Sequence, residues 1–344
     1  MKVEQLDPLN DPRWRALVDT ASGPSVFAHP DWLALLGRRY RYGMSALCVT
    51  DNGEIQLGLP LARVESRLTG KRLVAVPFTD TCPVVRRDGV NGAGSQLLAQ
   101  ALVDERRRTG LDIEVREELP GVPGGHVVPR FLTHRLALEA DADAVLARTS
   151  KSQIRRGINK AVREGVTTRR RTDRGALEEF YALHLRTRRR QGVPIQPKSF
   201  ILAFEQLFAR GLGYVVSAHQ GDQTLSAAVF LTHGDTVIYK YGASDERFLD
   251  RRPNNLLFAD VIRHACADGH AVLDFGRTDT DNTGLAAFKR AWGAAEEELS
   301  YTYVAERPPD LSEGRARKLL AELIRRGPER TGQVIGTALY RHVG

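Results

Sequence analysis

The chain has 344 residues, 42% of them hydrophobic, and carries 50 Lys and Arg against 42 Asp and Glu, for a net charge of +8. This length and composition predict two packed domains and exclude a generally disordered chain. Its 3 cysteines are far apart and form no CxxC pair, which argues against both a disulfide framework and a zinc site.

No apolar run approaches the ~20 residues that a membrane-spanning helix needs. Residues 1–14 carry acids and prolines where a signal peptide would carry basic and then apolar residues. We therefore expect a cytoplasmic protein without a transmembrane segment. The basic charge favours a polyanionic partner such as RNA, a nucleotide or an anionic lipid headgroup. Arginines scattered among Ala and Gly are also typical of proteins from GC-rich genomes. The basic charge could therefore reflect genome composition rather than a polyanionic partner, and both explanations stay open.

The first half predicts a strand meander, then a helix, then further strands. Apolar runs at 44–50 and 54–66 flank the turn Asp51-Asn52-Gly53, a strong hairpin signal, and 71–78 is a third strand. A Gly-rich turn then precedes the helical segment 95–108, and strands follow it.

A basic segment, residues 149–171, separates the halves, and Ser150 can cap a helix that Gly165 stops. The pattern of the first half then returns as three strands in 211–244, a helix in 254–269 and a strand. We interpret this as a duplicated α/β unit. The tail predicts two short basic amphipathic helices.

The segment "LDFGRTDTDNTGLAAFKRAWG", residues 273–293, ends a buried strand and gathers charged residues before a helix. Such loops commonly carry ligand contacts. Helix capping by Asp281, Asn282 or Thr283 is an equal alternative. On the helix we expect Phe288 and Trp292 to pack inward and Lys289 to point toward a cleft.

Seven motifs in order support a family resemblance: "FAHPDWLALL", "GEIQLGLPLARVES", "IRRGINKAVREGV", "HLRTRRRQGVP", "VIYKYGASDE", "RPNNLLFADVIRHA" and "DFGRTDTDNTGLAAFKRAWG". Together they resemble the Fem-type (FemABX) branch of the GNAT acyltransferase superfamily, over roughly residues 20–305. The resemblance implies an α/β fold with mixed α+β sheets, in two tandem GNAT-like domains with a cleft between them. The long coiled-coil arm of some members is missing. We expect domains at 1–148 and 149–308 and a helical tail at 309–344.

The resemblance also implies roles for individual residues. Lys289 falls on the family's "FK" lysine, which lies against substrate phosphate or carbonyl oxygen, and Asp279 is our candidate to orient or deprotonate the amine. Arg190 matches an arginine that holds the acidic part of the acceptor, whereas Arg188 and Arg189 are expected to face solvent. The other candidate substrate contacts are Tyr241, Tyr239, Arg277 and Asn255. Because Tyr239 and Tyr241 alternate with Lys240 on a strand, we expect both to share one face.

Characterised members transfer an amino acid from aminoacyl-tRNA to an amine of a peptidoglycan precursor. The resemblance therefore implies an amide-forming acyltransferase with no cofactor or metal, with tRNA as donor and an anionic peptide, nucleotide-linked or lipid-linked acceptor. DNA is not an expected partner, and a peripheral contact with the membrane surface is left open. The sequence shows no GxSxG or HExxH motif, so covalent catalysis is not expected.

Two alternatives remain. Leu35, Leu36 and Gly37 stand where related enzymes carry a lysine near the cleft, which favours an acyl-CoA-dependent N-acyltransferase acting on an amino sugar or polysaccharide precursor. Against it, Pro253, Asn254 and Asn255 replace the glycines that bind CoA diphosphate in GNAT enzymes. The second alternative is a catalytically silent binding module in envelope biogenesis.

Overall fold

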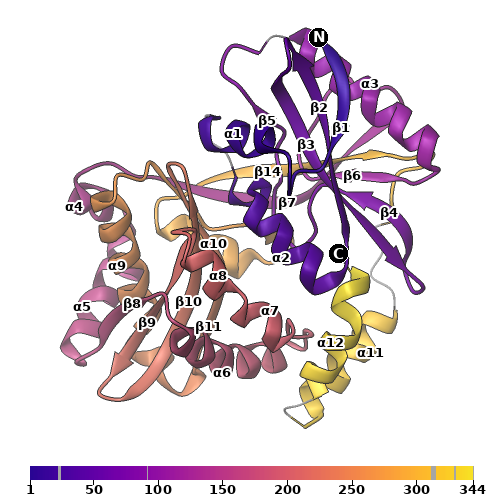
Figure 1. Ribbon diagram of the computed structural model, residues 1–344. Coiled ribbons are helices and arrows are strands. Elements are labelled where there is room, and N and C mark those ends of the chain that lie inside the picture. Colours follow the sequence, from indigo (N-terminus) through magenta and orange to yellow (C-terminus); the bar gives the residue numbers. More distant parts are fainter. Residues whose placement is uncertain (22–24, 91, 311–314, 329–330, 344) are drawn as a thin grey trace. The chain divides into compact units, whose positions relative to one another are not determined.

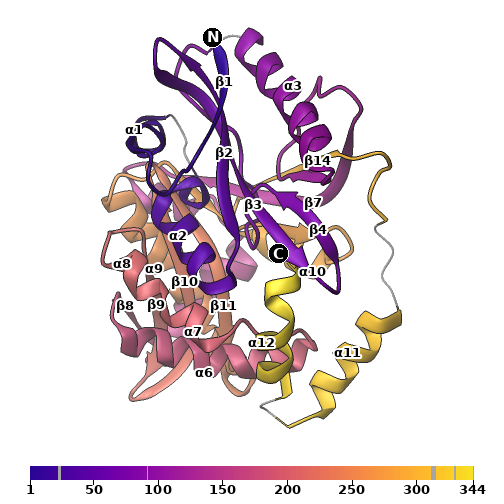
Figure 2. The ribbon, with the colours of Figure 1, turned by 45° about the vertical axis from the view of Figure 1, so that its right-hand side comes forward.

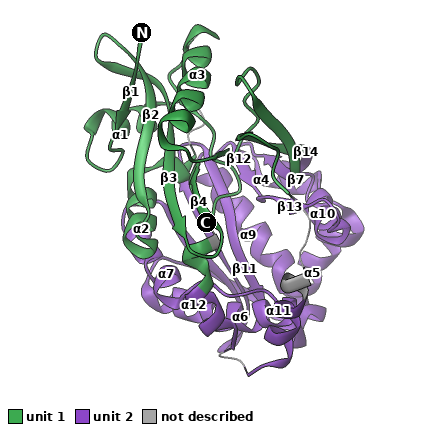
Figure 3. Ribbon diagram, turned by 90° about the vertical axis from the view of Figure 1, so that its right-hand side faces the viewer, with its two compact units in different colours: residues 1–131, 298–311, 339–344 green, residues 132–297, 312–338 purple. Residues whose placement is uncertain are grey.

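The computed structural model describes residues 1–21, 25–90, 92–310, 315–328 and 331–343 (Figure 1). The chain forms two compact units (Figure 3). Unit 1 comprises Met1–Phe131, Glu298–Leu311 and Leu339–Gly344, and unit 2 comprises Leu132–Glu297 and Ser312–Ala338. These units differ from the expected division at 148/149, because strands β7 and β14 each contribute residues to both units.

Unit 1 is built on a meander followed by a helix and further strands. Its strands are β1 (Lys2–Leu6), β2 (Gly43–Asp51), β3 (Glu54–Ser66), β4 (Gly70–Val74), β5 (Val85–Arg86), β6 (Ile113–Val115) and parts of β7 (Gly125–Ala137) and β14 (Ala295–Val304). Neighbouring strands follow the order β1-β2-β3-β4-β6-β14-β7, and β5 pairs with β3. The predicted hairpin is confirmed, because Asn52 and Gly53 both have the positive φ that this tight turn requires.

The helices of unit 1 cover its sheet. They are α1 (Pro12–Thr20), the 3-10 turn η1 (Val26–Ala28), α2 (Pro30–Tyr40) and α3 (Gly92–Thr109). Trp14 of α1 is fully buried, and its indole N–H donates to the carbonyl of Ala28 at 3.0 Å. The aromatic ring thus gains burial without losing its hydrogen bond.

Unit 2 repeats this plan (Figure 1). Its strands are β8 (Thr167–Arg171), β9 (Gly213–Gln220), β10 (Gln223–His233), β11 (Thr236–Ser244), β12 (Val272–Asp274), β13 (Thr278–Asp279) and the remainder of β7 and β14. Their order is β7-β12-β11-β10-β9-β8, and β13 pairs with β7. In both units the strand after the long helix runs parallel to the last meander strand, β6 beside β4 and β12 beside β11. This shared pairing supports the predicted duplication.

The helical elements of unit 2 lie on both faces of its strands (Figures 1 and 2). They are α4 (Ala142–Ala147), η2 (Lys151–Arg155), α5 (Arg156–Arg163), α6 (Arg174–Gln191), α7 (Lys198–Leu202), α8 (Phe204–Phe208), η3 (Glu246–Arg251), α9 (Pro253–Ala267), α10 (Thr283–Ala291) and α11 (Arg315–Arg326). Helix α9 packs on one face, where Phe258 contacts Phe230. Helix α6 packs on the other face, where His184 contacts Tyr241.

The tail forms the two predicted helices, α11 and α12 (Thr331–Val343). Helix α12 begins in unit 2 and ends in unit 1. Among the described residues, no helix is both long enough and apolar enough to cross a bilayer.

Candidate functional site

Lys289 lies inside unit 2 and contacts the loop that follows β12. Its side chain is only 2% exposed, and Nζ donates to the carbonyl oxygens of Gly276 at 2.7 Å and Arg277 at 3.1 Å. The sequence predicted that Lys289 points toward a cleft; in the structure its ammonium reaches back to the turn that precedes its own helix. Gly276 has φ +70°, and this turn brings the two carbonyls toward α10.

Asp279 and Arg277 sit on the same loop, and both are exposed. Asp279 belongs to the short strand β13, and its carbonyl accepts from the backbone N–H of Asn282 at 2.9 Å. Asn282 caps α10, since its side chain accepts from the N–H of Leu285 at 3.1 Å. The capping alternative is therefore confirmed for Asn282, and the loop still presents Asp279 to solvent.

Sequence analysis did not identify His134, which lies beside this loop. Its side chain is fully buried, with Nε2 2.9 Å from the Glu296 carboxylate and Nδ1 3.5 Å from the Thr278 hydroxyl. Burial lowers the pKa of His134, and the hydrogen bond to Glu296 opposes this effect. No local motif flags the histidine, because its partners come from β13 and β14.

The two candidate tyrosines do not share a face, contrary to the expectation. Val229 pairs with Tyr241 and Phe230 pairs with Tyr239, so a bulge at Lys240 interrupts the alternation of β11. Tyr239 packs against Phe230 on the face covered by α9, whereas Tyr241 lies against α6 and α8. Burial raises the pKa of Tyr239 to about 12. The two tyrosines therefore contact different layers of unit 2.

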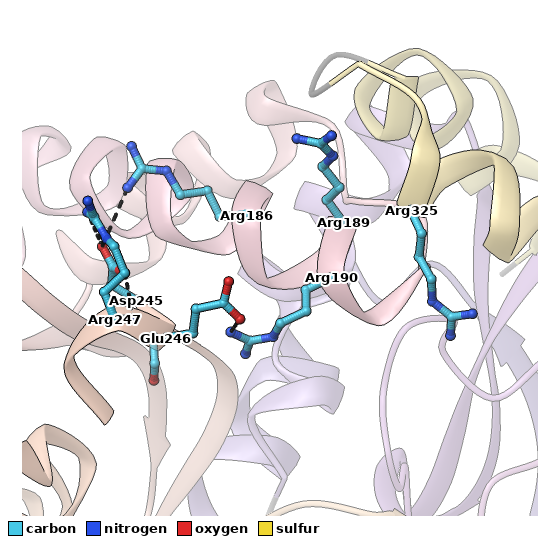
Figure 4. Close-up of a pocket in the computed structure, with 8 residues that line it drawn as sticks. Arg186, Arg189, Arg190, Asp245, Glu246, Arg247 and Arg325 are labelled. Carbon is cyan, nitrogen blue, oxygen red and sulfur yellow. Dashed lines mark hydrogen bonds and ion pairs between the residues drawn. The ribbon is translucent and has the colours of Figure 1, made fainter. Parts of the chain in front are cut away.

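A pocket of about 620 Å³ opens in unit 2 between the end of α6 and the turn after β11 (Figure 4). It is lined by Arg186, Arg189, Arg190, Ser244, Asp245, Glu246, Arg247 and Arg325. We call it the arginine pocket. Helix α6 ends at Gly192 in the left-handed conformation, so its arginine-rich last turn lies at the pocket. Arg189 lines the pocket and is half-buried.

Ion pairs organise the arginine pocket (Figure 4). Asp245 is 5% exposed and pairs with Arg247 at 2.6 Å and Arg186 at 3.7 Å. The hydrogen bond from Arg247 lowers the pKa of Asp245. Arg190 pairs with Glu246 at 3.1 Å. With five arginines and two carboxylates, the lining carries a net charge of +3, which suits an anionic ligand.

Asn255 has a structural partner. It is 7% exposed, and Nδ2 donates to the carbonyls of Gln153 at 3.0 Å and Ile154 at 3.4 Å. A Cβ on Gly157 would lie 2.6 Å from this nitrogen, so the glycine allows the basic segment to approach α9. Ser150 caps that segment as predicted, accepting from the N–H of Gln153 at 3.3 Å.

No cluster of three or more His, Cys, Asp or Glu side chains suited to a metal occurs within the described ranges. Of the sequence-predicted residues, the structure places Arg277 and Asp279 on the loop after β12, with Lys289 of α10 bonded to that loop, and places Arg190 in the arginine pocket. Asn255 lies elsewhere, beneath the basic segment.

Residues 148–290 match a family model described as an acetyltransferase (GNAT) domain. Lipid II:glycine glycyltransferase of Staphylococcus epidermidis is 35% identical over 92 residues, 24% of this chain and 22% of that protein. The enzyme of the same name from Staphylococcus aureus is 33% identical over 107 residues, 29% of this chain and 25% of that protein. The chain thus matches about a quarter of the length of these relatives.

Among solved structures, a crystal structure of FemX has a TM-score of 0.70 and 17% identity, over 95% of this chain and 100% of that one. L-PGS from Bacillus licheniformis has a TM-score of 0.59 and 13% identity, over 94% of this chain and 99% of that one. A tandem GNAT protein from the clavulanic acid biosynthesis pathway has a TM-score of 0.52 and 16% identity, over 90% of this chain and 100% of that one. These likenesses show a shared fold. Residues 148–290 therefore match a GNAT acetyltransferase domain, and the chain is similar to lipid II:glycine glycyltransferases over part of its sequence and to FemX in fold.

Proposed function

We propose that the protein is an amide-forming acyltransferase of Fem type. It transfers an aminoacyl group from aminoacyl-tRNA to an amine of a peptidoglycan-precursor-like or specialised peptide acceptor. The GNAT domain and the two lipid II:glycine glycyltransferases support this reaction class. A charged tRNA as donor implies a cytoplasmic reaction.

The observation that carries the proposal is the arginine pocket. The pocket lies at the end of β11, and its lining carries a net charge of +3. All of its lining residues except Arg325 belong to the matched GNAT domain. Arginine recognises phosphate and carboxylate with paired N–H donors, so this lining suits the acidic part of an acceptor. Glu246 pairs with Arg190 without ligand, and an anionic acceptor would replace it there.

The reaction needs a neutral amine placed against the ester carbonyl. The amine nitrogen forms a bond to the carbonyl carbon, the bond from that carbon to the tRNA oxygen breaks, and the amine proton ends on that oxygen. Asp279, exposed on the loop after β12, is our candidate to accept the proton, which then passes to the leaving oxygen. Lys289 is our candidate to fix this loop, because its ammonium donates to the carbonyls of Gly276 and Arg277. Orientation of the two reactants supplies much of the lowering of the barrier.

Binding of the two donor classes to the purified chain tests the proposal. Pooled aminoacyl-tRNA and acetyl-CoA are titrated at about 50 mM and about 200 mM salt. We expect tRNA binding that weakens by about tenfold or more at the higher salt, since each neutralised phosphate releases counterions. The matching control is the same tRNA pool after deacylation. We expect it to bind through its phosphate backbone but to yield no amide product when an acceptor is added.

The alternative is an acyl-CoA-dependent N-acyltransferase. One observation favours it: α9 begins at Pro253 after Arg252, and no side chain caps its first turn, so its N-terminus can receive an anion. Salt-insensitive binding of acetyl-CoA without tRNA binding would support this alternative. If neither donor binds, the protein is a binding module rather than a transferase.

A further inference from the structure

Helix α11 exposes two large apolar side chains. Leu319 is 73% exposed and Leu323 is 57% exposed. They are four residues apart, so they lie on one face of the helix. Exposure of two leucines on a short helix leaves apolar area in water that a partner could cover.

The opposite face of α11 is packed against unit 2. Ile324 is fully buried, and the guanidinium of Arg325 donates to the carbonyl of Gln191 at 3.2 Å. A Cβ on Gly192 would lie 2.8 Å from the carbonyl oxygen of Ala321, so α11 closely approaches the end of α6. The helix is therefore anchored to unit 2, and its two leucines stay exposed.

The charge of α11 is strongly positive. Its sequence, RARKLLAELIRR, carries Arg315, Arg317, Lys318, Arg325 and Arg326 with Glu322 as its acid. Arg326 is 82% exposed and also pairs with Glu322. An exposed apolar face on a helix whose sequence is rich in Arg and Lys is typical of helices that lie in the interface of a bilayer.

We propose that α11 docks on an anionic lipid surface, with Leu319 and Leu323 entering the headgroup boundary and the exposed Arg326 contacting lipid phosphate. Charge complementarity selects this partner, because a second copy of the chain, at +8, would repel a basic helix. Arg325 belongs both to α11 and to the arginine pocket, so docking would bring that pocket close to lipid headgroups. Docking by α11 does not require the proposed transferase activity.

Sedimentation of the full chain with vesicles tests the proposal. Vesicles of phosphatidylcholine with about 30% phosphatidylglycerol, as an anionic leaflet, are compared with phosphatidylcholine alone. We expect binding to the anionic vesicles at least about tenfold stronger than to the neutral ones. The variant Leu319→Ser/Leu323→Ser should lose about tenfold in partition to anionic vesicles.

The matched control is Leu68→Ser, which removes a leucine that is 67% exposed in unit 1 and should bind vesicles like the wild type. Thermal unfolding verifies that each variant is folded. Binding of the double variant at wild-type strength would overturn the proposal, because the basic chain would then adsorb by charge alone. Equal binding to both vesicle types, or no binding to either, would also overturn it.

Discussion

The buried ammonium of Lys289 donates to the carbonyl oxygen of Gly276 at 2.7 Å. This bond ties α10 to the turn after β12. Since the same Nζ also donates to the carbonyl of Arg277, one side chain fixes the backbone that leads to Asp279. The geometry thus assigns Lys289 a positioning role in the loop.

Replacing Lys289 by Met should destabilise the protein by about 1–3 kcal/mol, because the buried carbonyl of Gly276 and the carbonyl of Arg277 lose their donor. Urea unfolding measures this loss. The control Lys71→Met, at a side chain 60% exposed, should change stability by less than about 0.5 kcal/mol. Unchanged stability with lost transferase activity would instead mean that the ammonium acts on the substrate.

Gly157→Ala should destabilise the protein by about 1–3 kcal/mol, since the added Cβ would lie 2.6 Å from Nδ2 of Asn255. Gly284→Ala is the control: it also lies in a helix, and its Cβ would meet nothing within 4 Å. There alanine should be neutral or stabilising by up to about 1 kcal/mol. Thermal unfolding compares the two variants. Equal changes in stability would show that the Asn255 side chain can move aside without a loss of stability.

Stability should fall as the solution is acidified below pH 6.5. His184 is buried between Phe180 and Tyr241, and burial lowers its pKa from 6.5 to about 3. Because the unfolded chain binds a proton that folded His184 does not, stability is present above pH 6.5 and is lost as the pH falls toward 3. The loss attributable to this group is about 2 kcal/mol by pH 5.

Urea unfolding at pH 7.5 and pH 5 measures this dependence. His184→Phe should reduce the loss without removing it, because burial also lowers the pKa of His134 and His219. His264→Phe, at a side chain 44% exposed, should keep the wild-type pH dependence. If His184→Phe lost as much stability between pH 7.5 and pH 5 as the wild type, His184 would not be a source of the pH dependence.

Arg190→Ala should weaken binding of an anionic nucleotide-linked muropeptide by about 10- to 100-fold, the effect of losing one charged hydrogen bond. Glu246→Gln should strengthen the same binding, because Arg190 then has no competing carboxylate. Arg174→Ala, at the other end of α6 and 57% exposed, is the control and should bind normally. Isothermal titration gives all three constants, and weaker binding by Glu246→Gln would show that Glu246 is not a competitor.

Local patterns predicted much of the fold. The turn at Asn52-Gly53, the cap at Ser150 and the stop at Gly165 depend on neighbouring residues, and the structure confirms each of them. The duplicated order of strands and helix was equally visible, because apolar periodicity is a property of each segment.

The orientation of the candidate tyrosines was not predictable in this way. Strict alternation on β11 places Tyr239 and Tyr241 on one face, but the bulge at Lys240 depends on pairing with β10. His134 was missed for a similar reason, since Glu296 and Thr278 reach it from other strands.

By itself the sequence determined the elements, the duplicated α/β plan, the basic charge and the family resemblance, because all of these are local or additive properties of the chain. Tertiary structure alone decided that Lys289 is buried, that the tyrosines face opposite ways and that Arg325 joins Arg190 in one pocket. Each of these depends on contacts between residues distant in the chain, which are set by strand register and helix packing.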